Sequence, residues 1–456
     1  ICEIYVNKTV TLEAIDHGCI KGKHMASALR EPIYVVDGTR TPFLKARNAP
    51  GPFSASDLSV AAGRALLSRL PIAPTAIDEV ILGCANPSPD EVNIGRYVAM
   101  RLGCGDKVTG WTVMRNCASG MQALDSAINN MLAGRSQVVL AGGVDALSRA
   151  PLLYSEKMVL WFAALASARS MGQRVGVFAK LSPSALFSPV IALMKGLTDP
   201  KVGLLMGQTA ENIAYRFGIT RGDMDAFAAE SHKRVLAAQA AGSYKGEVIP
   251  LIDGKGNVYN DDDGARADST PEKLAKLKPF FDKKYGNVTA GNSSQITDGG
   301  VWLMLATKAA VEKHKLPVLG KIVDTQWAGC DPAQMGLGPV YASTPILKRN
   351  GLTLADLDTI EINEAFAAQV LACKRAWEDE KFCKEELGLD GAMGSIDMSK
   401  LNVDGGAVAL GHPVGASGAR IVLHALNVLK RSGGKRALAT ICIGGGQGGA
   451  MLLESA

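Results

Sequence analysis

The feature of this chain that most restricts its fold is a pattern that occurs twice. In the first part of the chain, short β-branched segments alternate with helical stretches, and the same alternation returns after Gly320. Two local matches link the parts: residues 78–81 (DEVI) resemble residues 358–361 (DTIE), and the Ala-Ser-Gly of 118–120 recurs at 416–418. We interpret the pattern as an internal duplication, in which two similar α/β halves face each other across one site.

The alternation predicts specific elements in each half. The first half favours strands at 33–36, 79–82, 108–114 and 137–140 and helices at 57–69 and 117–132, and the second favours strands at 321–325, 359–362 and 436–441 and helices at 340–349 and from Glu364 onward. Such alternation predicts an α/β fold with mixed, mainly parallel sheets that helices cover on both faces. A chain of 456 residues that is 47% hydrophobic can bury the cores of two or three such units.

A long insertion separates the two halves. Residues 149–297 hold an apolar helical stretch at 157–180, a helix near Thr209, an Asp-rich turn at 261–263 and a Gly/Asn/Ser loop at 290–295. Insertions of this length are usually functional, so we assign this one to substrate binding. The predicted units are an N-terminal half (28–148 with 298–318), an inserted loop domain (149–297) and a C-terminal half (319–456). Residues 1–27 show no signal-peptide pattern and are predicted to be an expression tag or a leader segment.

Charge and cysteine content narrow the functional classes. The net charge of +5 comes without a Lys/Arg block, which argues against nucleic acid as a partner and permits a phosphate-bearing ligand. The nine cysteines form no CxxC pair and are accompanied by only six histidines, so we predict no metal site and a reducing compartment. No apolar run reaches 18 residues, which argues against a membrane-spanning helix.

Cys117 is a candidate nucleophile. The strand before it is predicted to end near Met114 and helical spacing begins directly afterwards, which places Cys117 at a helix N-terminus. Free N–H groups and the helix dipole stabilise a thiolate there, and such cysteines have pKa values of roughly 3.5 to 7.5. For this feature taken alone, a buried structural cysteine is the commoner alternative.

Three further motifs favour catalysis. Asn363 opens an Asn-Glu-Ala-Phe segment, His412 lies in Gly-His-Pro after a Gly-Gly pair, and Cys442 precedes three consecutive glycines at 444–446. Each motif follows a strand or a glycine junction, where α/β sheets expose catalytic groups. Each residue also has a structural alternative as a turn or core residue. Together they supply a thiolate, a base, a second proton carrier and a hydrogen-bond donor.

With these four motifs in this order, the chain from about residue 32 to its end resembles the thiolase family. The resemblance implies a duplicated thiolase fold with layers in the order αβαβα. It implies that Cys117 is the acylated nucleophile, that His412 is the base that activates it, and that Cys442 is a second acid/base. It further implies that Asn363 holds a water beside His412 in one oxyanion hole, and that the backbone N–H groups of Cys117 and Gly444 form the other.

The same resemblance implies coenzyme A as co-substrate and no permanently bound cofactor. Ser294, in the loop 289–294, resembles the serine that binds the pantetheine arm. The residues that resemble those lining the acyl or nucleotide ends of the ligand are Met206, Arg266, Phe281 and Phe366. Leu205 stands where acetoacetyl-specific members carry histidine, which favours a longer or wider 3-ketoacyl group.

The implied reaction is thiolytic cleavage of 3-ketoacyl-CoA to acetyl-CoA and a shortened acyl-CoA, through an acyl-Cys117 intermediate, in fatty-acid β-oxidation. Cleavage develops negative charge at two oxygens, so two sets of donors suit it. The reverse reaction is a Claisen condensation. Alternatives are an acetyl-CoA acetyltransferase that forms acetoacetyl-CoA, a condensing synthase, which Cys442 disfavours, and a non-catalytic acyl-CoA-binding subunit.

The segment 157–187 resembles the insertion of thiolase subunits from trifunctional β-oxidation complexes. Those subunits typically carry His where Asn363 stands, so a hydratase/dehydrogenase partner and an enzyme acting alone both remain open. The resemblance also implies a homodimer or homotetramer, in the cytoplasm of a bacterium or the mitochondrial matrix of a eukaryote. Residues 151–196 are compatible with weak membrane-surface contact, although a lid or subunit contact is the commoner interpretation.

Overall fold

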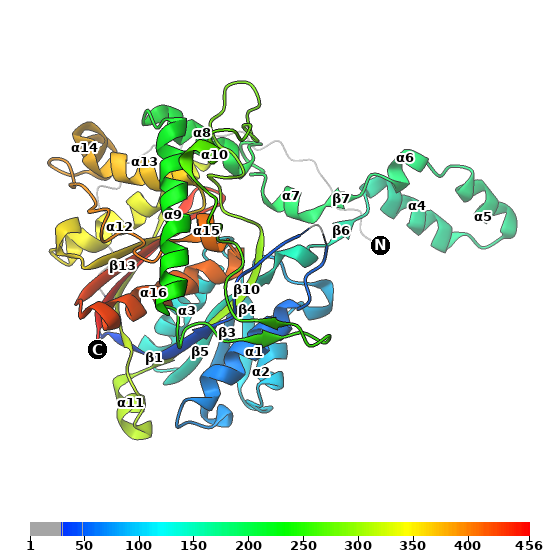
Figure 1. Cartoon of the computed structure of the whole chain (residues 1–456). Coiled ribbons are helices and arrows are strands. Elements are labelled where there is room, and N and C mark those ends of the chain that lie inside the picture. The colour runs from blue at the N-terminus through cyan, green and yellow to red at the C-terminus, as the bar shows by residue number, and fades with distance from the viewer. Residues whose placement is uncertain (1–28, 30, 48) are drawn as a thin grey trace, which may run out of the picture.

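The computed structural model describes residues 29, 31–47 and 49–456, so the interpretation of residues 1–27 lies outside the described residues (Figure 1). The elements of the first half are β1 (Ile33–Arg40), β2 (Leu44–Lys45), α1 (Ala55–Ser68), β3 (Glu79–Gly83), α2 (Ile94–Arg101), β4 (Thr109–Val113), α3 (Ser119–Leu132), β5 (Val138–Ala146) and β10 (Thr297–Ala306). Those of the second half are β11 (Gly320–Gly329), α12 (Gly338–Arg349), β12 (Thr359–Ile362), α13 (Ala367–Glu378), α14 (Glu380–Leu387), α15 (Ala407–Leu410), α16 (Val414–Ser432), β13 (Arg436–Ile443) and β14 (Gln447–Ser455), after the linking helix α11 (Lys308–His314).

The insertion between β5 and β10 is mainly helical. Its elements are β6 (Leu152–Leu153), α4 (Glu156–Ser167), α5 (Met171–Phe178), α6 (Pro183–Leu186), β7 (Val190–Ile191), α7 (Ala192–Gly196), α8 (Met206–Arg216), α9 (Arg221–Ala241), β8 (Leu251–Ile252), β9 (Val258–Tyr259) and α10 (Pro271–Leu274). The long helix α9 has clear boundary signals: a capping box between Thr220 and Asp223 begins it, and Gly242, with φ +71°, ends it.

Among the described residues, one sheet of ten strands runs through both halves in the order β12-β13-β14-β11-β1-β10-β5-β3-β4, with β2 paired to β10. Six of its nine strand pairs are antiparallel, including the pair β1–β11 that joins the halves. The prediction of a mixed sheet is therefore confirmed, whereas the prediction of mainly parallel pairing is wrong. The repeat pattern does not reveal β10 and β14, and these two strands run antiparallel to both of their long neighbours.

The strand order confirms the internal duplication. The first half reads β3-β5-β10-β1 and the second reads β12-β13-β14-β11, so β3 corresponds to β12, as the matching segments 78–81 and 358–361 predict. In the first half β4 pairs in parallel with β3, and in the second half a single parallel bridge from Ile360 to Leu401 takes that place. The helix α3 follows β4 in the first half. In the second half α16 follows Leu401 in the corresponding way, after the short helix α15.

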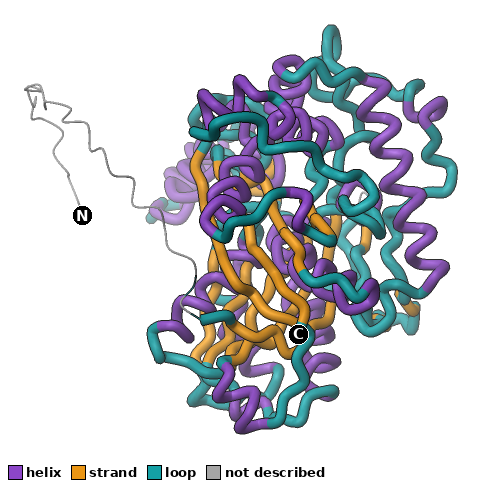
Figure 2. The backbone as a smooth tube through the Cα atoms, turned by 90° about the vertical axis from the view of Figure 1, so that its left-hand side faces the viewer, coloured by secondary structure: helices purple, strands orange, loops and turns teal. Residues whose placement is uncertain are grey.

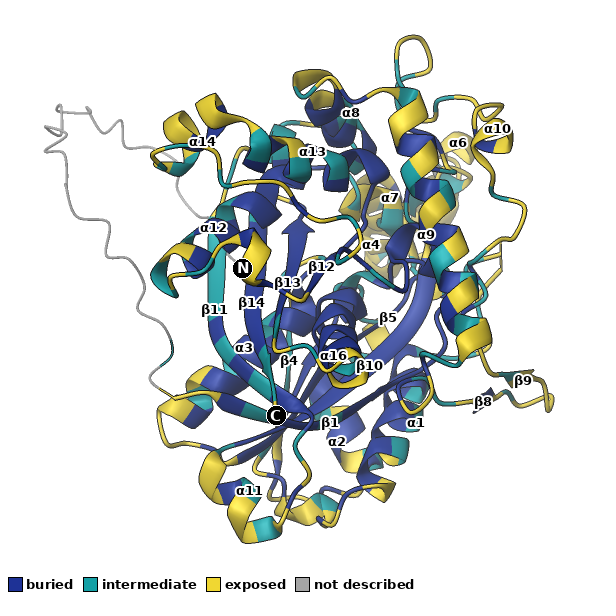
Figure 3. Ribbon diagram, turned by 60° about the vertical axis from the view of Figure 1, so that its left-hand side comes forward, coloured by how far each residue is buried: buried dark blue, intermediate teal, exposed yellow. Residues whose placement is uncertain are grey.

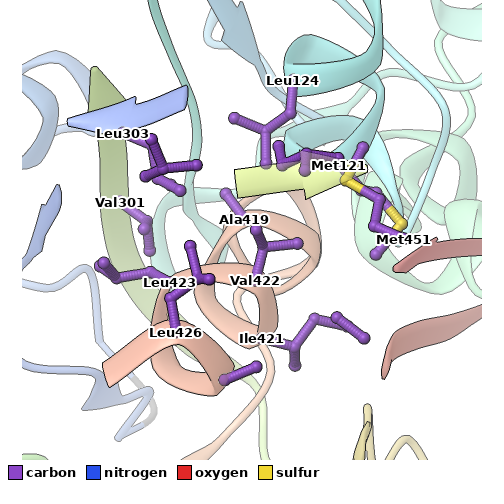
Figure 4. Close-up of a cluster of buried hydrophobic side chains, with 14 of the residues drawn as sticks. Met121, Leu124, Val301, Leu303, Ala419, Ile421, Val422, Leu423, Leu426 and Met451 are labelled. Atoms are coloured by element: carbon purple, nitrogen blue, oxygen red, sulfur yellow. The ribbon is translucent and has the colours of Figure 1, made fainter. Parts of the chain in front are cut away.

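Three buried clusters show the layering. The central cluster combines α3 and α16 with inward-facing residues of both halves of the sheet, and Figure 4 shows Leu423 and Leu426 of α16 beside Val301 and Leu303 of β10. A second cluster packs α1 and α2 on the outer face of the first half, and a third packs α12 and α13 on that of the second half. Helices α3 and α16 therefore form a central layer between the two halves of the sheet, and further helices cover the outer face of each half. This is the predicted αβαβα order (Figures 2 and 3).

The first part of the insertion forms an arm, defined here as residues 151–196, that projects from the rest of the molecule (Figure 1). Met158 is the one buried residue of α4, and α5 has none. Within the described ranges, no helix combines the length and apolarity needed to cross a membrane.

Candidate active site

Cys117 lies in a tight turn between β4 and α3. The helix begins at Ser119, two residues later than predicted. The Ser119 side chain braces the turn, because its hydroxyl donates to the carbonyl of Asn116 at 2.7 Å and accepts from the backbone N–H of Arg115 at 2.9 Å. Asn116 has a φ of +44°, in the left-handed region that residues other than Gly, Asn and Asp rarely adopt. The chain therefore turns sharply just before the cysteine.

The repeated Ala-Ser-Gly segments face each other where α3 meets α16. A β-carbon on Gly120 would lie 2.8 Å from the carbonyl oxygen of Gly415, and one on Gly418 would lie 2.8 Å from both the backbone nitrogen and the β-carbon of Met121. Only glycine fits at such short spacings. The two glycines therefore allow the N-terminal ends of both helices to approach closely, which draws the Cys117 turn and the His412 loop toward one place.

His412 lies in the loop between α15 and α16 and is almost fully buried. Its Nδ1 atom lies 2.6 Å from the Ser417 hydroxyl, and its Nε2 atom has no hydrogen-bond partner among the described groups. Burial, with a smaller contribution from the positive charge of Arg420, lowers the pKa of His412 to about 4. The imidazole is therefore neutral at physiological pH and can accept a proton.

Both candidate cysteines have a raised pKa, whereas a low pKa is predicted for Cys117 at a helix N-terminus. Burial raises the pKa of Cys117, while hydrogen bonds from its own N–H group and from that of Gly444 lower it. The predicted low pKa is thus wrong for the free site, because desolvation outweighs the two donors. Cys442 is fully buried at the end of β13, and burial together with the nearby Cys117 raises its pKa strongly. Cys442 therefore holds its proton at neutral pH.

Asn363 follows β12 directly and is fully buried. Its backbone N–H donates to the Thr440 carbonyl on β13 at 3.0 Å. Neither atom of its side-chain amide has a partner among the described groups. A buried amide without partners costs free energy, so this side chain is suited to a polar ligand or water.

The loop that contains Ser294 is bonded to the motif that contains Asn363. The backbone N–H of Ser294 donates to the Ala365 carbonyl at 3.0 Å, and that of Ala367 donates to the Asn292 carbonyl at 2.9 Å. The insertion is thereby joined directly to the second half beside the candidate site. The Ser294 side chain is half-buried, and the hydroxyl of the neighbouring Ser293 donates to the Thr289 carbonyl at 2.7 Å.

Three of the predicted acyl-contacting residues form one apolar surface. The sulfur of Met206 lies 3.2 Å from the position of a β-carbon on Gly444. Phe281 packs edge-to-face on Phe366, with ring centroids 6.0 Å apart and an interplanar angle of 82°. Both Met206 and Phe281 pack against the core cluster that includes Phe366 and Cys442. An apolar wall therefore lies next to the glycine turn.

Arg266 lies apart from this wall. Its side chain is 60% exposed and pairs with Asp268 at 3.1 Å. It lines a polar surface pocket of about 490 Å³ together with Lys45, Arg47 and Asp263. None of the candidate catalytic residues lines this pocket, but its edge residue Ala46 donates its N–H to the Ile296 carbonyl, two residues beyond Ser294.

Two buried carboxylates near the site have no counterpart in the sequence prediction. Asp145 accepts hydrogen bonds from the backbone N–H groups of Ala85, Asn86 and Gly415, and burial raises its pKa to about 6. It thereby ties β5 to the first turn of α16. Glu364 accepts from Ser231, Asn402 and the N–H of Val408, which fixes the approach to His412. The one signal in the sequence is that Glu364 lies in the Asn-Glu-Ala-Phe segment that Asn363 opens.

This arrangement, with a thiol between backbone donors, a neutral buried histidine and a second buried thiol, defines a class of acyltransferases that work through cysteine. In the described ranges, no group of three or more His, Cys, Asp or Glu residues could hold a metal ion. The chain belongs to the thiolase family: residues 33–309 match the model described as "Thiolase, N-terminal domain" and residues 316–455 match "Thiolase, C-terminal domain".

Individual proteins of this family resemble the chain over nearly its whole length. A 3-ketoacyl-CoA thiolase of Colwellia psychrerythraea is 38% identical and aligns over 95% of this chain and 99% of its own length. A mitochondrial 3-ketoacyl-CoA thiolase of Rattus norvegicus is 38% identical over 94% and 99% of the two chains. The human mitochondrial 3-ketoacyl-CoA thiolase solved with CoA has a TM-score of 0.81 at 37% identity, covering 95% of this chain and all of that one. A Bacillus anthracis acetyl-CoA acetyltransferase has a TM-score of 0.78 at 34% identity, covering 94% and 100%.

Proposed function

We propose that the chain cleaves 3-ketoacyl-CoA with free CoA to give acetyl-CoA and a shortened acyl-CoA, as a step of fatty-acid β-oxidation. One observation carries the proposal: the backbone N–H of Gly444, from the other half of the fold, lowers the pKa of the Cys117 thiol, while the buried Nε2 of His412 has no hydrogen-bond partner among the described groups and can take a proton. The similarity to proteins named 3-ketoacyl-CoA thiolase supports the same reaction.

In the proposed first half-reaction, His412 Nε2 takes the proton of Cys117, and the thiolate adds to the C3 carbonyl carbon of the substrate. The N–H groups of Cys117 and Gly444 stabilise the resulting oxyanion. The C2–C3 bond then breaks, and its electron pair forms the enolate of acetyl-CoA. Asn363, through a water, and His412 stabilise the enolate oxygen, and the Cys442 thiol protonates C2.

In the second half-reaction, free CoA releases the acyl group from Cys117. The Cys442 thiolate takes the proton of the CoA thiol, and the sulfur of CoA attacks the acyl-Cys117 thioester. The bond from the acyl carbon to Cys117 breaks, which gives the shortened acyl-CoA and returns a thiolate that His412 reprotonates. The buried position of Cys442 suits both of its steps, since it begins as a protonated thiol.

We propose that the insertion, residues 149–297, binds most of the CoA molecule, while 28–148 with 298–318 and 319–456 form the two catalytic halves. Ser294 binds the pantetheine arm beside the Asn363 motif. Arg266 contacts the nucleotide end at the polar pocket, where two further basic side chains favour phosphate. Met206, Phe281 and Phe366 contact the acyl group.

The test is an assay of acetyl-CoA release from 3-ketoacyl-CoA and free CoA, over acyl chains from C4 to C16. We expect release from several chain lengths and its loss in Cys117→Ala, with a covalent acyl adduct on Cys117 in the absence of CoA. If the wild-type protein releases no acetyl-CoA at any length, or if Cys117→Ala is fully active, the proposal is wrong.

The similarity to the Bacillus anthracis acetyl-CoA acetyltransferase favours a second candidate function, synthesis and cleavage of acetoacetyl-CoA. The same series distinguishes the two. Activity confined to C4 supports the acetyltransferase, whereas activity that persists beyond C4 supports the proposed substrate class. We expect the latter because Leu205 presents an apolar side chain directly before Met206.

We further propose that the arm contacts an anionic membrane surface weakly. It carries five basic residues against the single acid Glu156. Its exposed apolar side chains are Leu152, Leu153, Tyr154, Val159, Leu160, Phe162, Met171, Val175, Phe178, Phe187, Ile191 and Met194. Basic and apolar groups together favour the interface of an anionic bilayer. The outward projection of the arm in Figure 1 favours this role over that of a lid.

Sedimentation with vesicles tests this role. We expect binding to vesicles that contain phosphatidylserine and little binding to phosphatidylcholine vesicles, with binding weakened by salt. A variant with Lys157→Glu, Arg169→Glu and Arg174→Glu should lose binding, whereas Lys276→Glu, outside the arm, should keep it. Equal binding of both variants, or none by the wild type, would contradict the proposal.

We also propose that the protein is a homodimer or homotetramer, in the cytoplasm of a bacterium or the mitochondrial matrix of a eukaryote. The terminal position of β4 in the sheet supports self-association, since an edge strand offers backbone groups to a second copy. The bacterial and mitochondrial relatives support both locations. A hydratase/dehydrogenase partner is a further candidate, and co-purification from the native source tests it.

A further inference from the structure

Asn116, the residue directly before Cys117, links the two halves of the fold. Its side-chain Nδ2 atom donates to the carbonyl oxygen of Gly444 at 2.9 Å. Asn116 belongs to the turn before α3, and Gly444 belongs to the turn between β13 and β14. The bond therefore crosses from the candidate nucleophile's turn to the turn that supplies a donor to that nucleophile.

The turn that receives this bond has little conformational restraint of its own. Gly444 is followed by Gly445 and Gly446, whose φ angles are +93° and +76°. Glycine adopts many backbone conformations with little difference in energy, so such a run does not by itself fix the direction of an N–H group. At its far end the turn is held by the backbone, because the N–H of Cys330 donates to the Gly446 carbonyl at 2.8 Å.

The backbone of Asn116 fits this role. Its φ of +44° is a conformation that asparagine tolerates better than most residues. The Ser119 hydroxyl and the Ser119 N–H both bind the Asn116 carbonyl, which fixes the base of the side chain. The amide therefore reaches Gly444 from a rigid turn.

We propose that Asn116 is a positioning residue that holds the Gly444 N–H against the sulfur of Cys117. The proposal rests on the proposed function in treating Cys117 as the nucleophile. Asn116 holds the carbonyl of Gly444, and the N–H of the same residue faces the thiol. Loss of the amide lets the glycine turn rotate. The Gly444 N–H is then lost as a donor to the Cys117 thiolate and, later in the reaction, to the oxyanion of the tetrahedral intermediate.

Two variants separate this role from backbone effects. Asn116→Gly removes the amide and keeps the left-handed backbone accessible. Asn116→Asp keeps the shape but places an acceptor and a negative charge against the Gly444 carbonyl. Lys315→Gly is the matched control, because Lys315 also has a positive φ, at +51°, and lies in a separate element at the end of α11.

The measurement is the rate of Cys117 alkylation by iodoacetamide against pH, without substrate, together with kcat and KM. We expect both Asn116 variants to raise the pH midpoint of alkylation and to lower kcat about tenfold with little change in KM for CoA, since one donor to the transition state is lost. The control should keep the wild-type profile.

An Asn116→Gly protein that alkylates with the wild-type pH profile overturns the inference, even if its thermal stability is lower. Because alkylation needs no substrate, the proposed function fails separately: wild type without thiolytic activity overturns that function, while a shifted alkylation profile in the variants still supports the positioning role.

Discussion

The Nδ1 atom of His412 lies 2.6 Å from the hydroxyl oxygen of Ser417. That hydroxyl also lies 3.0 Å from the carbonyl oxygen of Pro413, the residue directly before α16, to which it can donate its own proton. We assign the single hydroxyl proton of Ser417 to the bond with Pro413, so that Ser417 accepts from His412 and the imidazole proton lies on Nδ1. The buried Nε2 is then the unprotonated nitrogen, as a base for Cys117 requires.

Ser417→Ala should lower kcat by roughly 10- to 100-fold with a small change in KM, because the imidazole loses the acceptor that selects its tautomer, and a positioned base contributes more than this in total. Steady-state kinetics against pH measure the effect. The control is Ser432→Ala, whose hydroxyl donates to the Leu429 carbonyl at the other end of the same helix. Equal activity of both variants would show that Ser417 does not orient His412.

Gly418→Ala should destabilise the protein by about 1 to 3 kcal/mol, because the new β-carbon would meet Met121 at 2.8 Å in a packed core. Chemical denaturation measures the change. Gly172→Ala in α5 is the control, since nothing lies within 4 Å of its β-carbon and alanine favours helix. If Gly418→Ala is as stable as Gly172→Ala, the close approach of α3 and α16 is not required for the fold.

His424 should make the stability of the protein depend on pH. It is buried, with Nδ1 2.8 Å from Glu247 and Nε2 3.1 Å from Asp404, and these carboxylates raise its pKa from 6.5 to about 10 despite the opposing effect of burial. Because the folded pKa is the higher one, the stabilisation is complete below pH 6.5 and is lost as the pH rises toward 10. The free energy of unfolding should fall by up to about 1.4 kcal/mol per pH unit across that interval.

Denaturant unfolding from pH 6.5 to 10 checks this dependence, with His424→Gln as the comparison. The variant should be less stable at pH 6.5, and the gap to wild type should narrow toward pH 10. A gap that stays constant with pH would mean that His424 is not charged in the folded protein.

Arg266→Ala should raise KM for CoA about three- to tenfold and leave kcat unchanged, because an exposed cation at the rim contributes equally to ground-state and transition-state binding. Initial-rate kinetics with varied CoA measure this. Lys273→Ala is a suitable control, since Lys273 approaches the same Asp268 at 3.5 Å but does not line the pocket. An equal effect from both variants would place the nucleotide elsewhere.

The sequence alone determined the duplication, and it predicts which residues make up the candidate site. Local patterns were sufficient for β3, β12 and the helices at 55–68 and 338–349, since hydrophobic periodicity is a property of neighbouring residues. They failed for the direction of strand pairing, because β10 and β14 are paired by contacts with strands far away in the chain. Motif order predicts Cys117, Asn363, His412 and Cys442 as the site residues, because each proposed role depends on residue type.

The tertiary structure decided how those residues work. The helix position of Cys117 suggested a low pKa, but burial by both halves raises it, and burial depends on the whole fold. Likewise only the fold brings the Gly444 N–H to Cys117 and the Asn116 amide to Gly444, across more than 300 residues of chain. Sequence specifies which groups are present, whereas desolvation and long-range hydrogen bonds set their protonation and direction.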